Sequence, residues 1–281
     1  MLRELIGNTP IIELNSGILA KLETYNPTGS IKDRVISYIV RKAIDSGDIK
    51  PNSILVEATS GNTGIALSAI GSHLGYQVKI IMPSNMSEER KQMMRFFGAE
   101  IVEVAPHDFK GAISLRNEMV SQGCWSPNQF ENQLNVECHF ETTALEIHKQ
   151  VTEIGEEWGA FVSGAGTGGT MMGVQKYVEK NNLNTQLVFM KPDEKEHGIQ
   201  GVGDGADYLL EQQLVSHTIS IKTENAIDKS IRLSRELGIP VGISAAANVL
   251  AAERYEQNHS TQGKTVTILC DRGERYMSNN P

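Results

Sequence analysis

Short apolar runs alternate with longer segments of helical periodicity along nearly the whole of this sequence, and this rhythm restricts the fold most strongly. The runs fall at residues 54–56, 78–82, 101–104, 160–162, 187–190 and 266–270. Short, continuously apolar strands are typical of parallel sheets that helices cover on both faces. The alternation therefore predicts an α/β fold with mostly parallel sheets.

Helices are predicted in the segments between these strands. Apolar residues from Ile36 to Ile44 share one face of a helix predicted over residues 33–46. Ser87 is placed to cap a further helix, which Gly98 is expected to end. Other helices are predicted at residues 64–74, 169–179 and 224–237.

The composition is that of an ordinary globular protein and excludes several classes. The 281 residues are 40% hydrophobic and carry a formal net charge of -8, which argues against a nucleic-acid-binding face. The three cysteines, Cys124, Cys138 and Cys270, are far apart and odd in number, so a disulfide framework is not expected. With no signal peptide or membrane span in the sequence, a reduced cytoplasmic setting is predicted.

A lysine-bearing loop at residues 26–34 is the first candidate for chemistry. Turn residues lead the chain to the mouth of the predicted helix, where Lys32 stands. The positive end of a helix dipole disfavours a protonated amine, which suits a lysine that forms a Schiff base. The loop alone equally allows a solvated surface lysine beside Arg34.

Two more loops follow predicted strands, where ligands of parallel α/β sheets bind. Residues 57–64 offer hydroxyls, an amide and free backbone N–H groups for a carboxylate, or form a plain helix cap. Residues 163–170 are rich in glycine, which lets the backbone approach a phosphate at a helix end. The spacing of Gly164, Gly166 and Gly169 also fits a weak dinucleotide-binding pattern, but no convincing acidic ribose partner follows.

These segments, in their order along the chain, resemble the cysteine synthase (O-acetylserine sulfhydrylase) family of pyridoxal-phosphate (PLP) enzymes. The segments are NPTGSIKDR at residues 26–34, TSGNTG at 59–64 and GTGGT at 166–170. The resemblance runs from residues 6–10 to residues 273–276, nearly the whole chain. The residues after Cys270 resemble the B isozyme, and the glycine loop resembles the A isozyme.

The resemblance implies a fold-type II PLP enzyme, similar to the β subunit of tryptophan synthase. Such a fold has two three-layer αβα subdomains with mostly parallel twisted sheets. The smaller, mobile subdomain is expected at about residues 33–135. The larger, cofactor-anchoring subdomain would comprise residues 1–32 and 136–281. A homodimer is also implied.

The same resemblance implies roles for individual residues. Lys32 would form the internal aldimine and later move the α-proton. Asn62 would hydrogen-bond the cofactor's 3-oxygen, and Ser244 would face the pyridine nitrogen. The phosphate would be bound by Gly166, Thr167, Gly168, Gly169 and Thr170. The substrate carboxylate would be held by Thr59, Ser60, Gly61, Thr63 and Gln129. No metal is expected, since the histidines and cysteines show no metal-binding pattern.

Ser244 carries the largest consequence for the reaction. A neutral hydroxyl, unlike an aspartate, does not keep the pyridine nitrogen protonated, so the ring is a weaker electron sink. Loss of a β-leaving group is then the expected route. The predicted reaction converts O-acetyl-L-serine through an aminoacrylate, to which sulfide adds to give L-cysteine.

Some positions depart from the family pattern. Residues 201–207 resemble a glycine-rich gate loop but contain Asp204 and Asp207, which could alter substrate entry or could be solvated loop carboxylates. The chain ends soon after Tyr276, so a longer C-terminal segment found in many relatives is expected to be missing or reduced.

Several alternatives remain open from the sequence. Within the same chemistry they are the use of thiosulfate or O-phosphoserine, cystathionine β-synthase activity, and serine or threonine dehydratase activity. From other classes they are a non-catalytic PLP-fold binding or regulatory protein and a dinucleotide-dependent oxidoreductase.

Overall fold

The computed structural model describes residues 2–203 and 209–279, which form two compact units. Unit 1 contains Asn26–Asn132 together with residues 2–6 and 275–279. Unit 2 contains Gly7–Tyr25 and the described residues of Gln133–Glu274. The subdomain limits expected from the resemblance, residues 33–135 against 1–32 and 136–281, remain a prediction. Asp204 and Asp207 lie outside the described residues.

Unit 1 is built on a three-stranded parallel sheet in the order β3-β4-β5. The strands are β3 (Ile54–Ala58), β4 (Gln77–Pro83) and β5 (Glu100–Val104). The helices are α1 (Lys32–Ser46), α2 (Asn62–His73), α3 (Glu88–Phe96) and α4 (Phe109–Ser121), with a 3-10 helix at Leu2–Leu5. A further 3-10 helix, Gly273–Asn279, begins in unit 2 and belongs to unit 1 from Arg275 onward.

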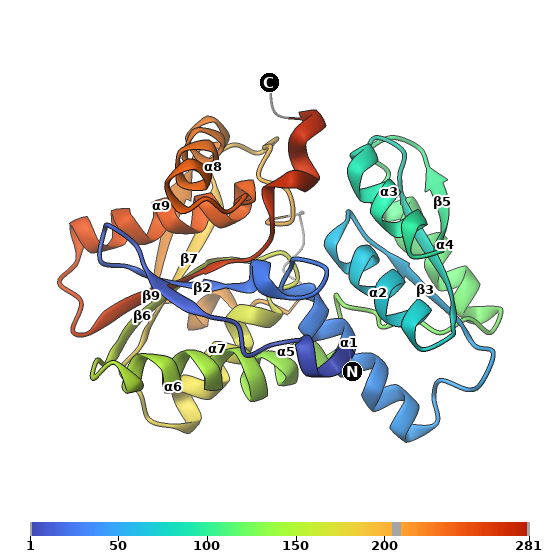
Figure 1. The fold of residues 1–281 in the computed structure, drawn as a ribbon, viewed down its shortest axis with the longest axis horizontal. Helices are drawn as coiled ribbons and strands as arrows, with labels where there is room; N and C mark the ends of the chain where they lie inside the picture. Colours follow the sequence, from blue (N-terminus) through green and yellow to red (C-terminus); the bar gives the residue numbers. More distant parts are fainter. Residues whose placement is uncertain (1, 204–208, 280–281) are drawn as a thin grey trace. The chain divides into compact units, whose positions relative to one another are not determined.

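Alternation along the strands of unit 1 supplies two apolar faces. Leu55 and Ile80 pack with residues of α1, α2 and α3 in one buried cluster. Val56 and Ile81, one residue further along, pack with Ala112 of α4 in another. The sheet therefore lies between two helical layers, as Figure 1 shows for α2 and α4.

Unit 2 is built on a six-stranded mixed sheet in the order β1-β2-β9-β6-β7-β8. Among the described strands, β1 pairs with β2 in the antiparallel sense and the other neighbouring strands pair in parallel. The strands are β1 (Ile11–Glu13), β2 (Leu19–Leu22), β6 (Trp158–Gly164), β7 (Gln186–Pro192), β8 (His217–Ile221) and β9 (Lys264–Leu269). Short 3-10 helices span Glu23–Tyr25 and Gln212–Leu214.

Helices cover both faces of this second sheet. The helices α8 (Thr223–Leu237) and α9 (Ile243–Asn258) lie on one side, where Leu22, Leu233 and Val249 share a buried cluster. The opposite side carries α5 (Leu134–His139), a π-helix (Phe140–Ala144), α6 (Leu145–Glu153) and α7 (Gly169–Lys180). The predicted α/β fold with mostly parallel sheets is thus confirmed.

The predicted elements are present with shifted ends, apart from two details. Ser87 occupies the cap position of α3, but its side chain makes no capping hydrogen bond. Its hydroxyl instead donates to the carbonyl oxygen of Arg275 at 2.9 Å, so the predicted side-chain cap was wrong. The last strand ends at Leu269, so Cys270 follows it instead of closing it.

Candidate active site

The loop after β3 gathers most of the residues predicted to hold a substrate carboxylate. The Thr59 hydroxyl accepts a hydrogen bond from the amide of Gly61 at 3.1 Å. The Thr63 hydroxyl donates to Oε1 of Gln129 at 2.6 Å. Thr59, Thr63 and Gln129 are buried, while Ser60 is half-buried at the same turn. Four of the five predicted residues therefore lie at this turn and the start of α2, and Gln129 contacts them through Thr63.

Where α2 begins, the backbone of the turn passes close to the Arg90 side chain. A Cβ at Gly61 would come within 2.5 Å of the Arg90 side chain, so only glycine fits without displacing it. Asn62, half-buried, is the first residue of α2 and follows Gly61 directly. The first backbone N–H groups of a helix have no partner within the helix, so this turn presents donors suited to an anion.

Glu57 lies beneath this turn, and sequence reasoning gave it no role. Its carboxylate accepts hydrogen bonds from the backbone amides of Ala58 at 2.9 Å and Gln129 at 3.2 Å. The Arg116 guanidinium lies 3.5 Å away. Burial raises the pKa of Glu57 to about 7, although Arg116 and the amides act in the opposite direction. An acidic residue inside an otherwise apolar strand was the sequence signal that could have identified it.

Lys32 is the first residue of α1 and is held by a rigid preceding loop. The amide of Thr28 donates to Oδ2 of Asp33 at 2.7 Å, and the Thr28 hydroxyl donates to the other carboxylate oxygen. The amide of Lys32 itself donates to the Ser30 hydroxyl at 3.3 Å. These bonds fix the backbone from which the half-buried Lys32 side chain projects.

Arg275 anchors the same loop from the other end of the chain. Its fully buried guanidinium donates to the carbonyl oxygen of Gly29 at 3.1 Å and also to that of Thr28. The adjacent Tyr276 ring lies under the guanidinium of Arg90, 4.7 Å from its carbon. The motif at residues 273–276 was part of the resemblance without an assigned role, and here it supports the lysine loop.

The glycine loop of unit 2 forms the N-terminal mouth of α7. Gly168 caps this twelve-residue helix with a φ of 88°. A Cβ there would also come within 2.3 Å of the backbone nitrogen of Leu210. Both the positive φ and this close approach therefore require glycine. Gly166 is equally restricted, because a Cβ would approach the carbonyl oxygen of Gly201 to 2.4 Å. Both glycines are therefore required by packing against Leu210 and Gly201, and the backbone amides at the start of α7 are of the kind that binds an anion.

Two threonines of this loop are held from α5, through residues that sequence reasoning missed. The Thr167 hydroxyl accepts from the amide of Gly169 at 3.3 Å and from the side chain of Asn135 at 3.0 Å. The Thr170 hydroxyl lies 3.2 Å from Nε2 of His139, whose Nδ1 lies 2.9 Å from the hydroxyl of Thr143. His139 is completely buried, and only the fold brings it to the loop.

Ser244 lies in the first turn of α9, 3.2 Å from the sulfur of Cys270. The same helix contributes Asn248, which accepts from the amide of Gly164 at 2.7 Å and donates to the carbonyl oxygen of Ile268 at 3.1 Å. Asn248 therefore connects the start of the glycine loop to β9. Cys270 is half-buried beside Ser244, so its surroundings include a polar group as well as packing.

The donor set fits pyridoxal phosphate. In unit 2, the mouth of α7 has amides and hydroxyls of the kind that would bind a phosphate, and Ser244 has a neutral hydroxyl of the kind that would face a ring nitrogen. In unit 1, Lys32 has the amine and Asn62 the amide side chain that such a cofactor would need. No group of three or more His, Cys, Asp or Glu side chains within residues 2–203 and 209–279 is arranged to hold a metal ion. No helix in the described part of the chain has the length and apolar character needed to cross a membrane.

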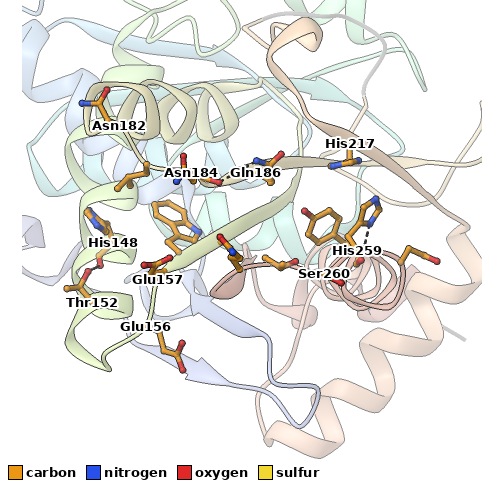
Figure 2. Close-up of a pocket in the computed structure, with 17 residues that line it drawn as sticks. His148, Thr152, Glu156, Glu157, Asn182, Asn184, Gln186, His217, His259 and Ser260 are labelled. Atoms are coloured by element: carbon orange, nitrogen blue, oxygen red, sulfur yellow. Dashed lines mark hydrogen bonds between the residues drawn. The ribbon is translucent and has the colours of Figure 1, made fainter.

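Unit 2 also contains a cavity of about 1100 Å³ at the amino ends of β6, β7 and β8, which begin at Trp158, Gln186 and His217. In Figure 2, His148 lies on one side of this cavity, and His217 and His259 lie on the other. The glycine loop follows the carboxyl end of β6, at the opposite end of the strand. No residue predicted for the site lines this cavity, which is therefore separate from the glycine loop.

Together, the parallel sheets, the glycine-lined helix mouth and the lysine at the start of a helix define an α/β enzyme built to hold a phosphorylated cofactor. The family model described as "Pyridoxal-phosphate dependent enzyme" matches residues 2–271, and the chain belongs to this family. Together with the cysteine synthase relatives described next, this match confirms the resemblance noted in the sequence.

Three individual proteins show similarity over nearly the whole chain. The cysteine synthase of Staphylococcus aureus (strain Mu50 / ATCC 700699) is 36% identical over 98% of this chain and 94% of its own length. The crystal structure of a cysteine synthase from Entamoeba histolytica matches with a TM-score of 0.89 and 36% identity, covering 99% of this chain and 89% of that one. An O-ureido-L-serine synthase structure matches with a TM-score of 0.93 and 32% identity, covering 99% and 93%.

Proposed function

We propose that this chain is a PLP-dependent cysteine synthase, which makes L-cysteine from O-acetyl-L-serine and sulfide by replacing the group on the β-carbon. The observation that carries the proposal is the glycine-lined mouth of α7 in a chain whose α1 begins with Lys32. Full-length similarity to the cysteine synthase of Staphylococcus aureus supports the same reaction.

In this proposal each loop has one task. The amides and hydroxyls of residues 166–170 bind the phosphate, and the Asn62 side chain and the Ser244 hydroxyl hydrogen-bond the ring. Pyridoxal phosphate, when bound, draws electron density from the substrate α-carbon and so promotes loss of the β-substituent. The Lys32 Nζ holds the cofactor covalently in the resting enzyme and takes the proton from the substrate α-carbon.

The turn after β3 is proposed to hold the substrate carboxylate. Backbone N–H groups at the start of α2 and the hydroxyls of Thr59, Ser60 and Thr63 are the donors. The Gln129 amide, already hydrogen-bonded to Thr63, completes the set with its own N–H donors. Charge-assisted hydrogen bonds of this kind orient the α-carbon toward a base.

The experiment compares Lys32→Ala with Lys50→Ala, an exposed lysine in the same unit. Purified protein is saturated with pyridoxal phosphate, and both visible absorbance and cysteine formation are measured. The Lys32 variant is expected to lose the absorbance of lysine-bound cofactor and at least about 1,000-fold in rate, because it lacks both the covalent anchor and the base. The Lys50 variant should keep both properties. A Lys32 variant with wild-type absorbance and rate contradicts the assignment.

The physiological substrates form a finer part of the proposal. The O-ureido-L-serine synthase structure matches this chain as closely as the cysteine synthase structure does. Similarity of fold therefore does not decide whether a sulfur or an oxygen nucleophile replaces the group on the β-carbon. Competition between sulfide, thiosulfate and homocysteine, with O-acetyl-L-serine and O-phosphoserine as alternative donors, tests this choice. We also propose a homodimer in the cytoplasm, which light scattering of the purified protein and cell fractionation would test.

A further inference from the structure

A buried ion pair supports the turn that is proposed to bind the substrate carboxylate. The Glu57 side chain is fully buried in β3, two residues before Thr59. Arg116 of α4 is 4% exposed and lies 3.5 Å from the Glu57 carboxylate. A buried ion pair contributes little to stability compared with apolar residues of the same volume, so stability alone does not explain its presence.

Glu57 acts on Gln129 through the backbone. The amide of Gln129 donates to Oε2 of Glu57 at 3.2 Å, which fixes the point from which the Gln129 side chain leaves the chain. That side chain accepts the Thr63 hydroxyl at 2.6 Å. The Glu57 carboxylate is therefore one hydrogen bond from Gln129 and two from Thr63, both of which are proposed to bind the substrate carboxylate.

Arg116 holds the same segment from its other side. Its guanidinium donates to the Ser126 hydroxyl at 3.1 Å and to Oδ1 of Asn128 at 2.9 Å. Asn128 has a φ of 47°, so the chain turns sharply just before Gln129. The ion pair and these bonds together determine the path of residues 126–129.

We propose that Glu57 is a positioning residue whose charge state controls the affinity of the turn after β3 for the substrate carboxylate. This inference rests on the proposed function of the turn. The ionised carboxylate accepts the Gln129 and Ala58 amides and pairs with Arg116. The neutral acid accepts both amides more weakly and loses its attraction to Arg116, so the segment that carries Gln129 is held less firmly.

The groups around Glu57 make this switch effective near neutral pH. Arg116 of α4 is the charged group that acts on Glu57. The backbone amides of Ala58, Asn128 and Gln129 also stabilise its charged form, and the apolar Ile80 lies opposite it on the neighbouring strand β4. Burial is the largest influence and raises the pKa of Glu57 to about 7. The interactions that hold residues 126–129 are therefore stronger above this pH, where Glu57 is ionised, and weaker below it.

The test is the pH dependence of KM and kcat for O-acetyl-L-serine in wild type, Glu57→Gln and Arg116→Gln. Wild-type KM is expected to rise roughly tenfold as pH falls through the Glu57 titration, with a smaller change in kcat, because a charge-assisted hydrogen bond is weakened. Glu57→Gln keeps the size of the side chain without its charge, so KM should be high at all pH values. Arg116→Gln should move the wild-type transition to higher pH, because it removes the cation that favours the charged form.

A matched control and a binding measurement complete the design. Glu100→Gln removes a carboxylate of β5 that is 59% exposed and pairs with Lys79, and it should leave the pH profile unchanged. Glycine has a carboxylate but no β-substituent, so its affinity, followed through the cofactor absorbance, reports binding without turnover. The affinity for glycine should follow the same pH dependence as KM in each variant.

The outcomes separate this inference from the proposed function. Absence of both cofactor absorbance and cysteine formation in the wild type refutes the proposed function. Normal absorbance and activity, with the same pH dependence of KM in wild type and Glu57→Gln, refutes the positioning role alone. If Glu57→Gln does not fold, an unchanged transition in Arg116→Gln has the same consequence, because that variant retains the carboxylate.

Discussion

Gly168, at the mouth of α7, allows a quantitative test of how tightly the glycine loop packs against Leu210. Gly168→Ala introduces a Cβ at a φ of 88°, in the left-handed region, 2.3 Å from the backbone nitrogen of Leu210 and 2.8 Å from its Cα. Both neighbouring atoms belong to the backbone and cannot rotate away as the end of a side chain can. The substitution therefore adds a steric clash to conformational strain.

The expected magnitude has two parts. A left-handed conformation costs a non-glycine residue roughly 1–2 kcal/mol, and overpacking costs roughly 1–3 kcal/mol. Gly168→Ala should therefore lower the free energy of unfolding by about 2–5 kcal/mol. Gly238→Ala is the matched control, because Gly238 has a φ of 65° after α8 but no atom within 4 Å of a Cβ. This control should lose only the conformational part, about 1–2 kcal/mol.

Urea denaturation of the cofactor-free protein, followed by tryptophan fluorescence, measures both losses. Trp158 in β6 is buried in the same unit as both glycines and reports on its unfolding. Titration with pyridoxal phosphate adds a functional readout: Gly168→Ala should weaken binding at least about tenfold, because the turn must shift away from Leu210. Equal losses of stability in the two variants, with unchanged cofactor affinity, would refute the proposed close approach of this loop to Leu210.

Two further predictions concern buried charges. Because the pKa of Glu57 is raised from 4.5 to about 7, the native state binds more protons than the unfolded state between these values, and stability falls as pH rises through that window. The loss attributable to Glu57 is about 3 kcal/mol, and urea denaturation at several pH values should show that Glu57→Gln lacks it; parallel curves would contradict the assignment. Lys21, completely buried, donates to the carbonyl oxygen of Thr9 at 2.6 Å and to Glu146 at 2.8 Å. Lys21→Met should cost about 3 kcal/mol by removing the buried cation that pairs with Glu146, and a thermal transition within about 2 °C of wild type would argue against the pair.

Sequence periodicity alone determined much of the fold. The buried strands β3, β4, β6 and β7 and the helices α1, α2, α7 and α8 were predicted because their apolar patterns are local and strong. The strands β1, β2 and β8 and the helices α4, α5, α6 and α9 were not predicted. With three and four residues, β1 and β2 offer too few positions for a clear period. Polar residues interrupt β8, and the alanine-rich α9 is apolar without a distinct stripe.

For the candidate site, the sequence placed the residues proposed to be reactive on particular loops, and tertiary structure decided what supports them. Lys32, the turn after β3 and the glycine loop could be recognised because each is a continuous segment with its own local chemistry. The supports come from far away along the chain: Arg275 reaches Gly29 across 246 residues, Gln129 reaches Glu57 across 72, and His139 reaches Thr170 across 31. Such pairs depend on strand order and helix packing, and a local pattern of residues carries no information about either.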